Sequence, residues 1–248
     1  MLALNNVTVK YGNRTILSHV SLQIHPGELV CIIGPSASGK SLLMALLTKT
    51  LSPLEGTIEV DGVDLNLLPT GILHLYRNRL GITLQEDSLS PHRTVAENLS
   101  LPLELRDASQ SSIAQNVTTF LQKIHLAHRA FDLPSALSHG ERKLLLIARS
   151  LIHNPLILLA DEPLANLDTE QAIRAIKLFE EHHNRGNTVI IMTTDARLPE
   201  ELKARIVELH RGTLKETVHT QQSTPEESKT HDIFEEVSEG KKVKITAT

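Results

Sequence analysis

The chain has 248 residues, of which 40% are hydrophobic and 22% are charged, and its formal net charge is −4. This composition is typical of a globular protein, and its slight acidity argues against a general nucleic-acid-binding surface. Aromatic residues make up only 2% of the chain, too few for a platform on which bases stack. We therefore expect no nucleic-acid partner.

The cysteine content and the apolar runs indicate the compartment. The one cysteine, Cys31, excludes an internal disulfide framework and favours a reducing environment. The first residues lack the charged and apolar regions of a signal peptide, and no apolar run approaches the ~18 residues that a membrane span needs. The sequence therefore predicts a cytoplasmic protein.

The start of the chain is predicted to form strands that lead into a loop and a helix. Residues 2–11 and 15–24 read as strands around a short turn, which predicts an antiparallel hairpin. Residues 29–34 form a continuous apolar run, typical of a strand buried on both faces. A glycine-bounded loop and a helical pattern over residues 42–51 follow, and residues 56–62 return to strand alternation.

The middle of the chain is predominantly helical, and the rest alternates strands with a helix. Helical patterns separated by polar turns occupy about residues 86–154, which predicts a helical subdomain inserted into an α/β core. A buried strand, a helix ending at Gly186 and two further strands are then predicted at residues 154–163, 169–186, 188–195 and 205–212. The polar residues 217–248 are predicted to form a mostly disordered tail.

The loop "GPSASGKS" (34–41) matches the pattern of a phosphate-binding loop. Glycines at both ends let backbone N–H groups wrap a polyphosphate, while Lys40 reaches its β- and γ-oxygens and Ser41 can bind Mg²⁺. The alternative is a glycine-rich turn with an unrelated lysine, and the flanking strand and helix argue against it. The residues predicted here to contact nucleotide are Gly34, Pro35, Ser36, Ala37, Ser38, Gly39, Lys40, Ser41 and Leu42.

A second motif, "LILLADEP" (156–163), places two carboxylates at the end of a buried strand. The carboxyl ends of parallel strands meet at one edge of a sheet, so Asp161 is expected beside the phosphate loop, where it can hold Mg²⁺. Glu162 is placed to orient or deprotonate an attacking water. The alternative is a strand that simply ends in a polar turn.

A third motif, "LSHGERKLLLIARSL" (137–151), reads as a capped helix. Ser138 is a good N-cap residue, and Glu141 three positions later completes a capping box. Gly140 is a poor helix former in the first turn, where the free N–H groups of a helix can bind an anion. A capped helix without a ligand is the alternative, but it does not explain the glycine.

These motifs, in their order and spacing, resemble those of ABC-type ATPase subunits. The resemblance rests on "GPSASGKS", on Gln85 in "GITLQEDSLSP", and on "LSHGERK", "LLADEP" and "ANLD", and it covers about residues 2–215. It implies an α/β fold with a P-loop NTPase core, an N-terminal antiparallel β subdomain and an inserted helical subdomain. The ATP-binding domain would span residues 1–216, and it would hydrolyse ATP with Mg²⁺ bound.

The resemblance implies roles for residues outside the phosphate loop. Tyr11 would stack on the adenine, whereas from the sequence alone it could equally be a core aromatic. Gln85 would complete the Mg²⁺ shell with Ser41 and Asp161. It would also respond to a transmembrane partner.

The resemblance further implies a homodimer. Ser138 and Gly140 would bind the γ-phosphate held by the phosphate loop of a second subunit. Asp168, in "ANLD", would belong to the loop that crosses to that subunit. Two chains would thus sandwich two ATP molecules head to tail.

Two longer stretches indicate a branch of the family. "EDSLSPHRTVAENLSLPL" and "KLFEEHHNRGNTVIIMTTDARL" resemble the cell-division ATP-binding proteins of the FtsE type. That resemblance implies a transmembrane partner like FtsX and a location on the inner face of the cell membrane, held there by the partner. Subunits of lipoprotein, lipid or macrolide exporters share much of this pattern and stay as alternatives.

One position departs from the family pattern. The strand "VIIMTTD" should end in Thr-His-Asp, with the histidine contacting the γ-phosphate, but Thr194 takes its place. A hydroxyl still donates a hydrogen bond, yet it is shorter and carries no charge. We therefore expect slow hydrolysis, and a clamp that binds ATP but hardly hydrolyses it is a further alternative.

The 13 histidines do not suggest a metal site. No cysteine or carboxylate lies near them at the spacing of zinc ligands. Residues such as His182 and His183 are instead predicted at solvated helix positions.

Overall fold

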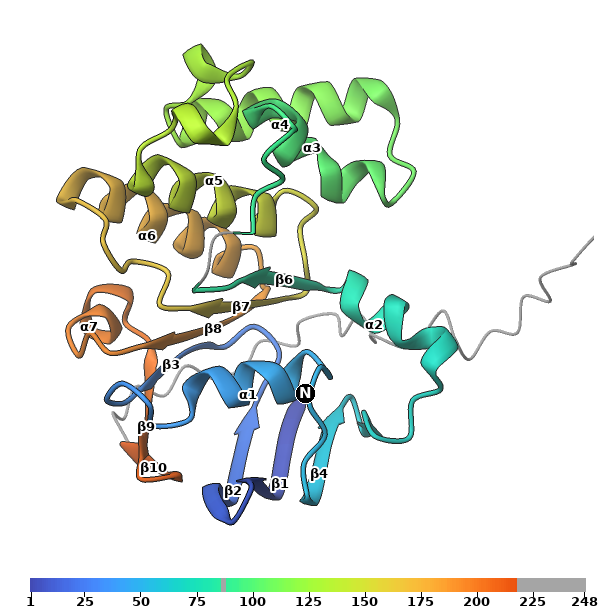
Figure 1. Cartoon of the computed structure of the whole chain (residues 1–248), viewed down its shortest axis with the longest axis vertical. Coiled ribbons are helices and arrows are strands. Elements are labelled where there is room, and N and C mark those ends of the chain that lie inside the picture. Colours follow the sequence, from blue (N-terminus) through green and yellow to red (C-terminus); the bar gives the residue numbers. More distant parts are fainter. Residues whose placement is uncertain (86–87, 218–248) are drawn as a thin grey trace, which may run out of the picture.

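Two β-sheets and a layer of helices build the part of the chain that the computed structural model describes, residues 1–85 and 88–217 (Figure 1). One sheet is antiparallel, with the order β2-β1-β4-β5, and consists of β1 (Leu2–Tyr11), β2 (Arg14–Ile24), β4 (Glu55–Val60) and β5 (Val63–Asp64). The other has the order β10-β9-β3-β8-β7-β6 and is parallel except for β10. Its strands are β3 (Leu29–Ile33), β6 (Leu80–Thr83), β7 (Ile157–Asp161), β8 (Thr188–Thr193), β9 (Arg205–His210) and β10 (Thr213–Thr217).

The helices divide between the two faces of the six-stranded sheet (Figure 1). The antiparallel sheet and α1 lie on one side of it, and most of the other helices cover the opposite side. The α-helices are α1 (Lys40–Leu47), α2 (Leu73–Asn78), α3 (Val95–Glu104), α4 (Gln110–Lys123), α5 (His139–Leu151), α6 (Thr169–His183) and α7 (Leu198–Leu202).

Alternate residues of the central strands serve two separate cores. Val30 and Ile32 of β3 pack with α1 and the antiparallel sheet, whereas Leu29 and Cys31 pack with the helices on the other face. Both faces of the strand are therefore buried, which explains the unbroken apolar run in the sequence. Cys31 is fully buried, and burial raises the pKa of its thiol to about 12.

The elements follow the sequence predictions with a few differences. Five short elements were not predicted, because each has too few residues to establish a period; they are β5, β6, β10, α2 and α7. Helix α6 ends at His183 and not at Gly186, since a turn follows it. The predicted tail, residues 217–248, lies outside the described residues apart from Thr217, the last residue of β10. None of the helices in the described part of the chain is both long and apolar enough to span a bilayer.

Candidate active site

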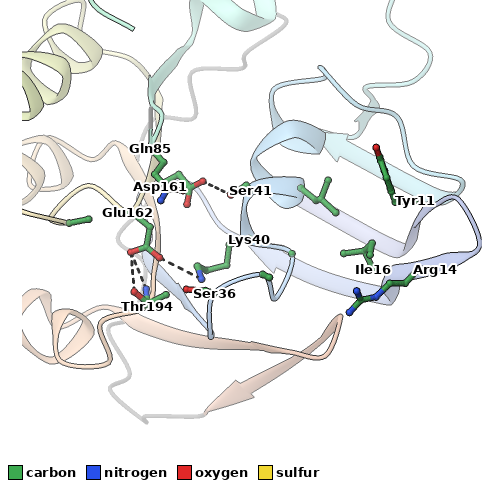
Figure 2. Close-up of a pocket in the computed structure, with 14 residues that line it drawn as sticks. Tyr11, Arg14, Ile16, Ser36, Lys40, Ser41, Gln85, Asp161, Glu162 and Thr194 are labelled. Carbon is green, nitrogen blue, oxygen red and sulfur yellow. Dashed lines mark hydrogen bonds and ion pairs between the residues drawn. The ribbon is translucent and has the colours of Figure 1, made fainter. Parts of the chain in front are cut away.

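A pocket of about 570 Å³ opens where the antiparallel sheet faces the carboxyl ends of β3, β7 and β8 (Figure 2). It gathers most of the residues that the sequence predicts as nucleotide or metal ligands. Three lining residues, Arg14, Ile16 and Ala165, were not predicted. Arg14 pairs with Tyr11 across the β1–β2 hairpin, and Ile16 lies two residues further along the strand. The lining residues are Tyr11, Arg14, Ile16, Ser36, Ala37, Gly39, Lys40, Ser41, Leu42, Gln85, Asp161, Glu162, Ala165 and Thr194.

The loop between β3 and α1 has a geometry that depends on its glycines. A Cβ on Gly34 would overlap the carbonyl oxygen of Leu209 on the neighbouring strand, and Gly39 has a φ of +110°, in the left-handed region. Lys40 begins α1 at 6% exposure, and its Nζ donates to the carbonyl oxygens of Gly34 at 2.8 Å and Pro35 at 3.1 Å. The ammonium is therefore held inside the loop.

Two buried polar atoms of the site have no hydrogen-bond partner within the described residues. They are Oγ of Ser38 in the loop and Oδ1 of Asp161 at the end of β7. A buried polar atom without a partner is costly. Asp161 lines the pocket, so a cation bound there would supply a partner for its Oδ1, whereas Ser38 is not part of the pocket lining.

Asp161 and Ser41 meet at one end of the pocket, which the sequence predicts as the metal-binding end. The Ser41 hydroxyl donates to Oδ2 of Asp161 at 2.8 Å, so Asp161 lies beside the phosphate loop, as the sequence predicts. Burial raises the pKa of Asp161, while the Ser41 hydrogen bond and the nearby cations Lys40 and Lys143 lower it. Gln85 also lines the pocket, and the side-chain oxygens of Ser41, Asp161 and Gln85 are the kind of ligand that Mg²⁺ prefers.

Glu162 occupies a constrained position next to the loop lysine. Its φ is 45°, a left-handed conformation that is uncommon outside glycine and asparagine and clusters at functional sites. Oε2 of Glu162 accepts hydrogen bonds from the Thr193 hydroxyl at 3.2 Å, the Thr194 backbone N–H at 3.1 Å and the Thr194 hydroxyl at 3.4 Å. Its Oε1 lies 3.5 Å from Nζ of Lys40. The carboxylate is thus fixed between Thr194 and Lys40 at the wall of the pocket (Figure 2).

The exposure of Tyr11 and of His182 tests two predictions about where their side chains lie. Tyr11 is 85% exposed at the pocket wall, which excludes a core role. His182 is only 2% exposed, so its predicted solvated position is wrong. It lies at the end of an amphipathic helix, where its ring turns inward next to Asn187.

Six predicted site residues lie outside the lining of the pocket. Gly34, Pro35 and Ser38 belong to the phosphate loop itself, whereas Ser138, Gly140 and Asp168 lie at the starts of α5 and α6. Ser138 caps α5, and its exposed hydroxyl accepts the Glu141 backbone N–H at 3.2 Å in the predicted capping box. Asp168 caps α6 in the same way, accepting from the Gln171 backbone N–H at 2.8 Å. Within one chain the first turn of α5 therefore makes no part of the pocket wall.

The structure gives a reason for a glycine at position 140 that lies within one chain and that the sequence does not reveal. A Cβ at this position would overlap the side-chain amide of Gln171. That amide, in turn, accepts a hydrogen bond from the Asp168 backbone N–H at 3.3 Å. The glycine therefore leaves room for the Gln171 amide between the starts of α5 and α6.

Comparisons with known proteins agree with this geometry. The model of the family described as ABC transporter matches residues 17–165. The chain belongs to this family. The Cell division ATP-binding protein FtsE of Bacillus subtilis is 33% identical over 213 residues, covering 86% of this chain and 93% of that protein. The Glutamine transport ATP-binding protein GlnQ of Escherichia coli is 34% identical over 217 residues, covering 87% and 90%.

A solved structure shares the fold. The ATP-binding cassette MJ0796, in a dimeric post-hydrolysis state bound to ADP and Pi, has a TM-score of 0.79 and 31% identity, covering 87% of this chain and 98% of that one. Family membership and this structure confirm the predicted fold class and the prediction of an ATP-hydrolysing subunit that uses ATP and Mg²⁺. At the level of the family, they also support pairing of subunits and attachment to a transmembrane partner.

Proposed function

We propose that two copies of this chain bind two ATP molecules head to tail and couple ATP hydrolysis to a transmembrane partner of the cell-division type. This proposal rests on one observation: the residues predicted to contact ATP lie at two separate places on the same chain. The phosphate loop, Asp161 and Glu162 meet in one pocket, whereas Ser138 is exposed elsewhere on the same chain. A second copy would bring its Ser138 to the open side of the pocket.

The pocket residues have distinct roles in this proposal. Tyr11 stacks on the base, and Lys40 turns from its loop carbonyls to the β- and γ-phosphates. Ser41, Gln85 and Asp161 hold Mg²⁺, which when bound offsets the negative charge that builds up on the phosphate oxygens.

Glu162 is the residue that orients and deprotonates the attacking water. Its carboxylate is fixed by Thr193 and Thr194, so little reorganisation is needed when the water binds. Thr194 supplies neither the reach nor the charge of an imidazole to the γ-phosphate, and we expect slow turnover for that reason.

ATP-dependent dimerisation of the Glu162→Gln variant tests the proposal. Without a base the nucleotide stays intact, so light scattering should detect a dimer with ATP and Mg²⁺ and a monomer without nucleotide. Adding Ser138→Arg should abolish the dimer, because a bulky cation would fill the site for the partner's γ-phosphate. Ser111→Arg, at an exposed serine of α4, is the matched control and should leave the dimer intact. A monomer under all conditions would contradict the proposal.

The cell-division assignment is supported by relatives named FtsE from several bacteria, at 30–35% identity. GlnQ proteins reach 33–34%, so identity alone does not separate the branches. A neighbouring gene for a four-span membrane protein with a large extracytoplasmic domain, like FtsX, would favour cell division. Any other partner architecture would favour an exporter or importer.

A clamp that binds ATP and hardly hydrolyses it is the second candidate, and Thr194 favours it. Turnover of the chain assembled with its membrane partner distinguishes the two. Hydrolysis that the partner stimulates supports the coupled ATPase, whereas ATP-dependent assembly without turnover supports the clamp.

A further inference from the structure

Helix α5 lies close along strand β6 and carries a buried lysine. At one end of this contact, a Cβ on Gly81 would overlap the carbonyl oxygen of Ser150, so the helix and the strand approach as only glycine allows. Next to it the Thr83 hydroxyl donates to Oγ of Ser150 at 2.9 Å. One face of α5 thus follows β6 toward the active site.

Lys143 lies about two helical turns closer to the start of α5. It is 4% exposed, among apolar neighbours such as Leu144 and Ile147. Burying an ammonium group costs several kcal/mol unless it is well hydrogen-bonded. Its Nζ donates to the carbonyl oxygen of Leu84 at 3.2 Å. Leu84 directly precedes Gln85, so the lysine holds the peptide that leads into the predicted metal ligand.

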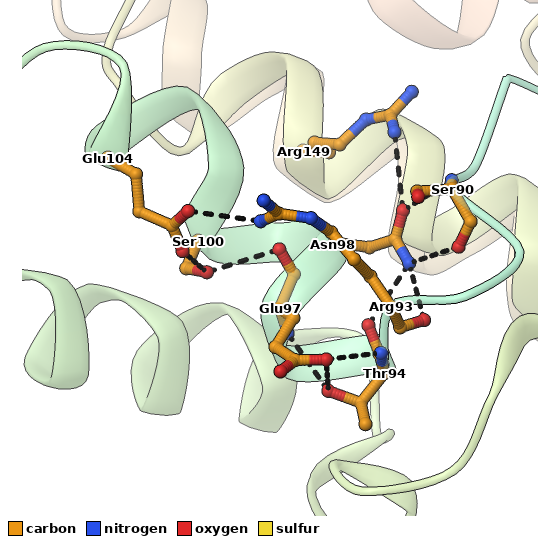
Figure 3. Close-up of polar contacts among 8 residues, drawn as sticks. All are labelled: Ser90, Arg93, Thr94, Glu97, Asn98, Ser100, Glu104 and Arg149. Carbon is orange, nitrogen blue, oxygen red and sulfur yellow. Dashed lines mark hydrogen bonds and ion pairs between the residues drawn. The ribbon is translucent and has the colours of Figure 1, made fainter.

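Residues 88–90 are also anchored to helices α3 and α5, and Figure 3 shows the contacts of Ser90 with Asn98. Arg149 of α5 donates to the carbonyl oxygen of Ser88 at 3.1 Å and to its Oγ at 2.8 Å. Fully buried Asn98 of α3 accepts the Ser90 backbone N–H at 2.8 Å and donates to the Ser90 carbonyl at 3.0 Å. Gln85 therefore lies between two anchored points of the backbone, and Lys143 makes the nearer contact.

We propose that Lys143 is a positioning residue for the metal-binding end of the pocket. By fixing the Leu84 carbonyl, its ammonium sets the distance and orientation of the Gln85 amide relative to Ser41 and Asp161. This inference rests on the proposed role of Gln85 as a Mg²⁺ ligand.

Lys143→Met tests it, because methionine keeps the length and removes the donor. The readout is the gain in affinity for a fluorescent ATP analogue when Mg²⁺ is added. Loss of a residue that supports a metal ligand typically costs 10–100-fold in metal affinity, so we expect the Mg²⁺-dependent gain to fall by about 10-fold. Affinity for the analogue in EDTA should stay unchanged, which also shows that the variant is folded. Lys177→Met, at an exposed lysine of α6, should behave as wild type.

A double-mutant comparison with Gln85→Ala decides whether Lys143 acts through Gln85. If it does, Lys143→Met should add nothing to the loss caused by Gln85→Ala. Additive losses, an unchanged Mg²⁺ gain in Lys143→Met, or an equal loss in Lys177→Met would overturn the inference. If Gln85→Ala alone has no effect, the proposed metal role of Gln85 fails, which is a different result. Lys143→Gln keeps a neutral donor and provides the same comparison, with a smaller expected loss, if the methionine variant does not fold.

Discussion

At the scale of single residues, the contacts between Thr194 and Glu162 bear most directly on the proposed turnover. The Thr194 hydroxyl and backbone N–H both bind the carboxylate that we assign as the base. The threonine is thus directed at Glu162, whereas the proposed dimer needs a donor directed at the γ-phosphate. Because Thr193 also binds Glu162 at 3.2 Å, replacing Thr194 leaves the carboxylate anchored.

Thr194→His should raise ATP turnover at least tenfold in the assembly with the membrane partner. A preorganised donor to the transition state is typically worth on the order of 10²–10³ in rate. Nucleotide affinity should hardly change, since the phosphate loop supplies the other donors. Thr194→Asn, a neutral donor, is the control and should gain much less. Equal turnover of wild type and Thr194→His would mean that another group or another step sets the rate.

At the scale of elements, the side chain of Gln171 lies between the starts of α5 and α6. Gln171 lies over Gly140 and bonds the Asp168 backbone N–H. Gly140→Ala should therefore push the Gln171 amide away and lose about 1 kcal/mol with that cap contact. Because alanine is about 1 kcal/mol more favourable than glycine in a helix, the net change in the free energy of unfolding should be small. Chemical denaturation measures this change.

The double variant Gly140→Ala with Gln171→Ala provides the check. Removing the amide relieves the overlap, so Gly140→Ala should be more favourable in the Gln171→Ala background than alone. Equal effects in both backgrounds would show that the glycine is needed for something other than this contact.

The elements also show how far the sequence alone leads. The phosphate loop and the strand before Asp161 were predictable, because short local patterns fix both their structure and their chemistry. The contact of Gly140 with Gln171 and the pocket position of Ile16 were not, since they join segments far apart in the chain. Burial of His182 was missed for a similar reason, as helical spacing alone did not place its ring in the interior.

At the scale of the whole molecule, stability should depend on pH through two buried histidines. Burial lowers the pKa of His153 and of His182 to about 4 from an ordinary value of 6.5. As pH falls below 6.5, the unfolded chain takes up protons that the folded chain does not, so the free energy of unfolding should fall until about pH 4. The loss is on the order of 3 kcal/mol per histidine.

Denaturation curves at pH 7 and pH 5 check this expectation. The difference in the free energy of unfolding between pH 7 and pH 5 should be smaller in His182→Gln, because glutamine cannot take up the proton. His25→Gln, at an exposed histidine, should retain the full difference. A His182→Gln variant with the wild-type pH dependence would show that this histidine titrates normally in the folded chain.

The central claim for the whole molecule is that each ATP site combines the phosphate loop of one chain with Ser138 of another. In a mixed dimer of Lys40→Ala and Ser138→Arg chains, one site carries both defects and the other carries neither. Each variant alone has a defect in both of its sites. The claim therefore predicts complementation on mixing.

Retained ATP in such mixtures is the most direct measurement, made with Glu162→Gln in both chains to prevent hydrolysis. The account predicts stable dimers that retain one ATP each in the mixture, and no stable dimer with ATP for either variant alone. If the mixture retains no more ATP than the separate variants, while both remain folded, the two halves of the site do not come from different chains and the account is contradicted.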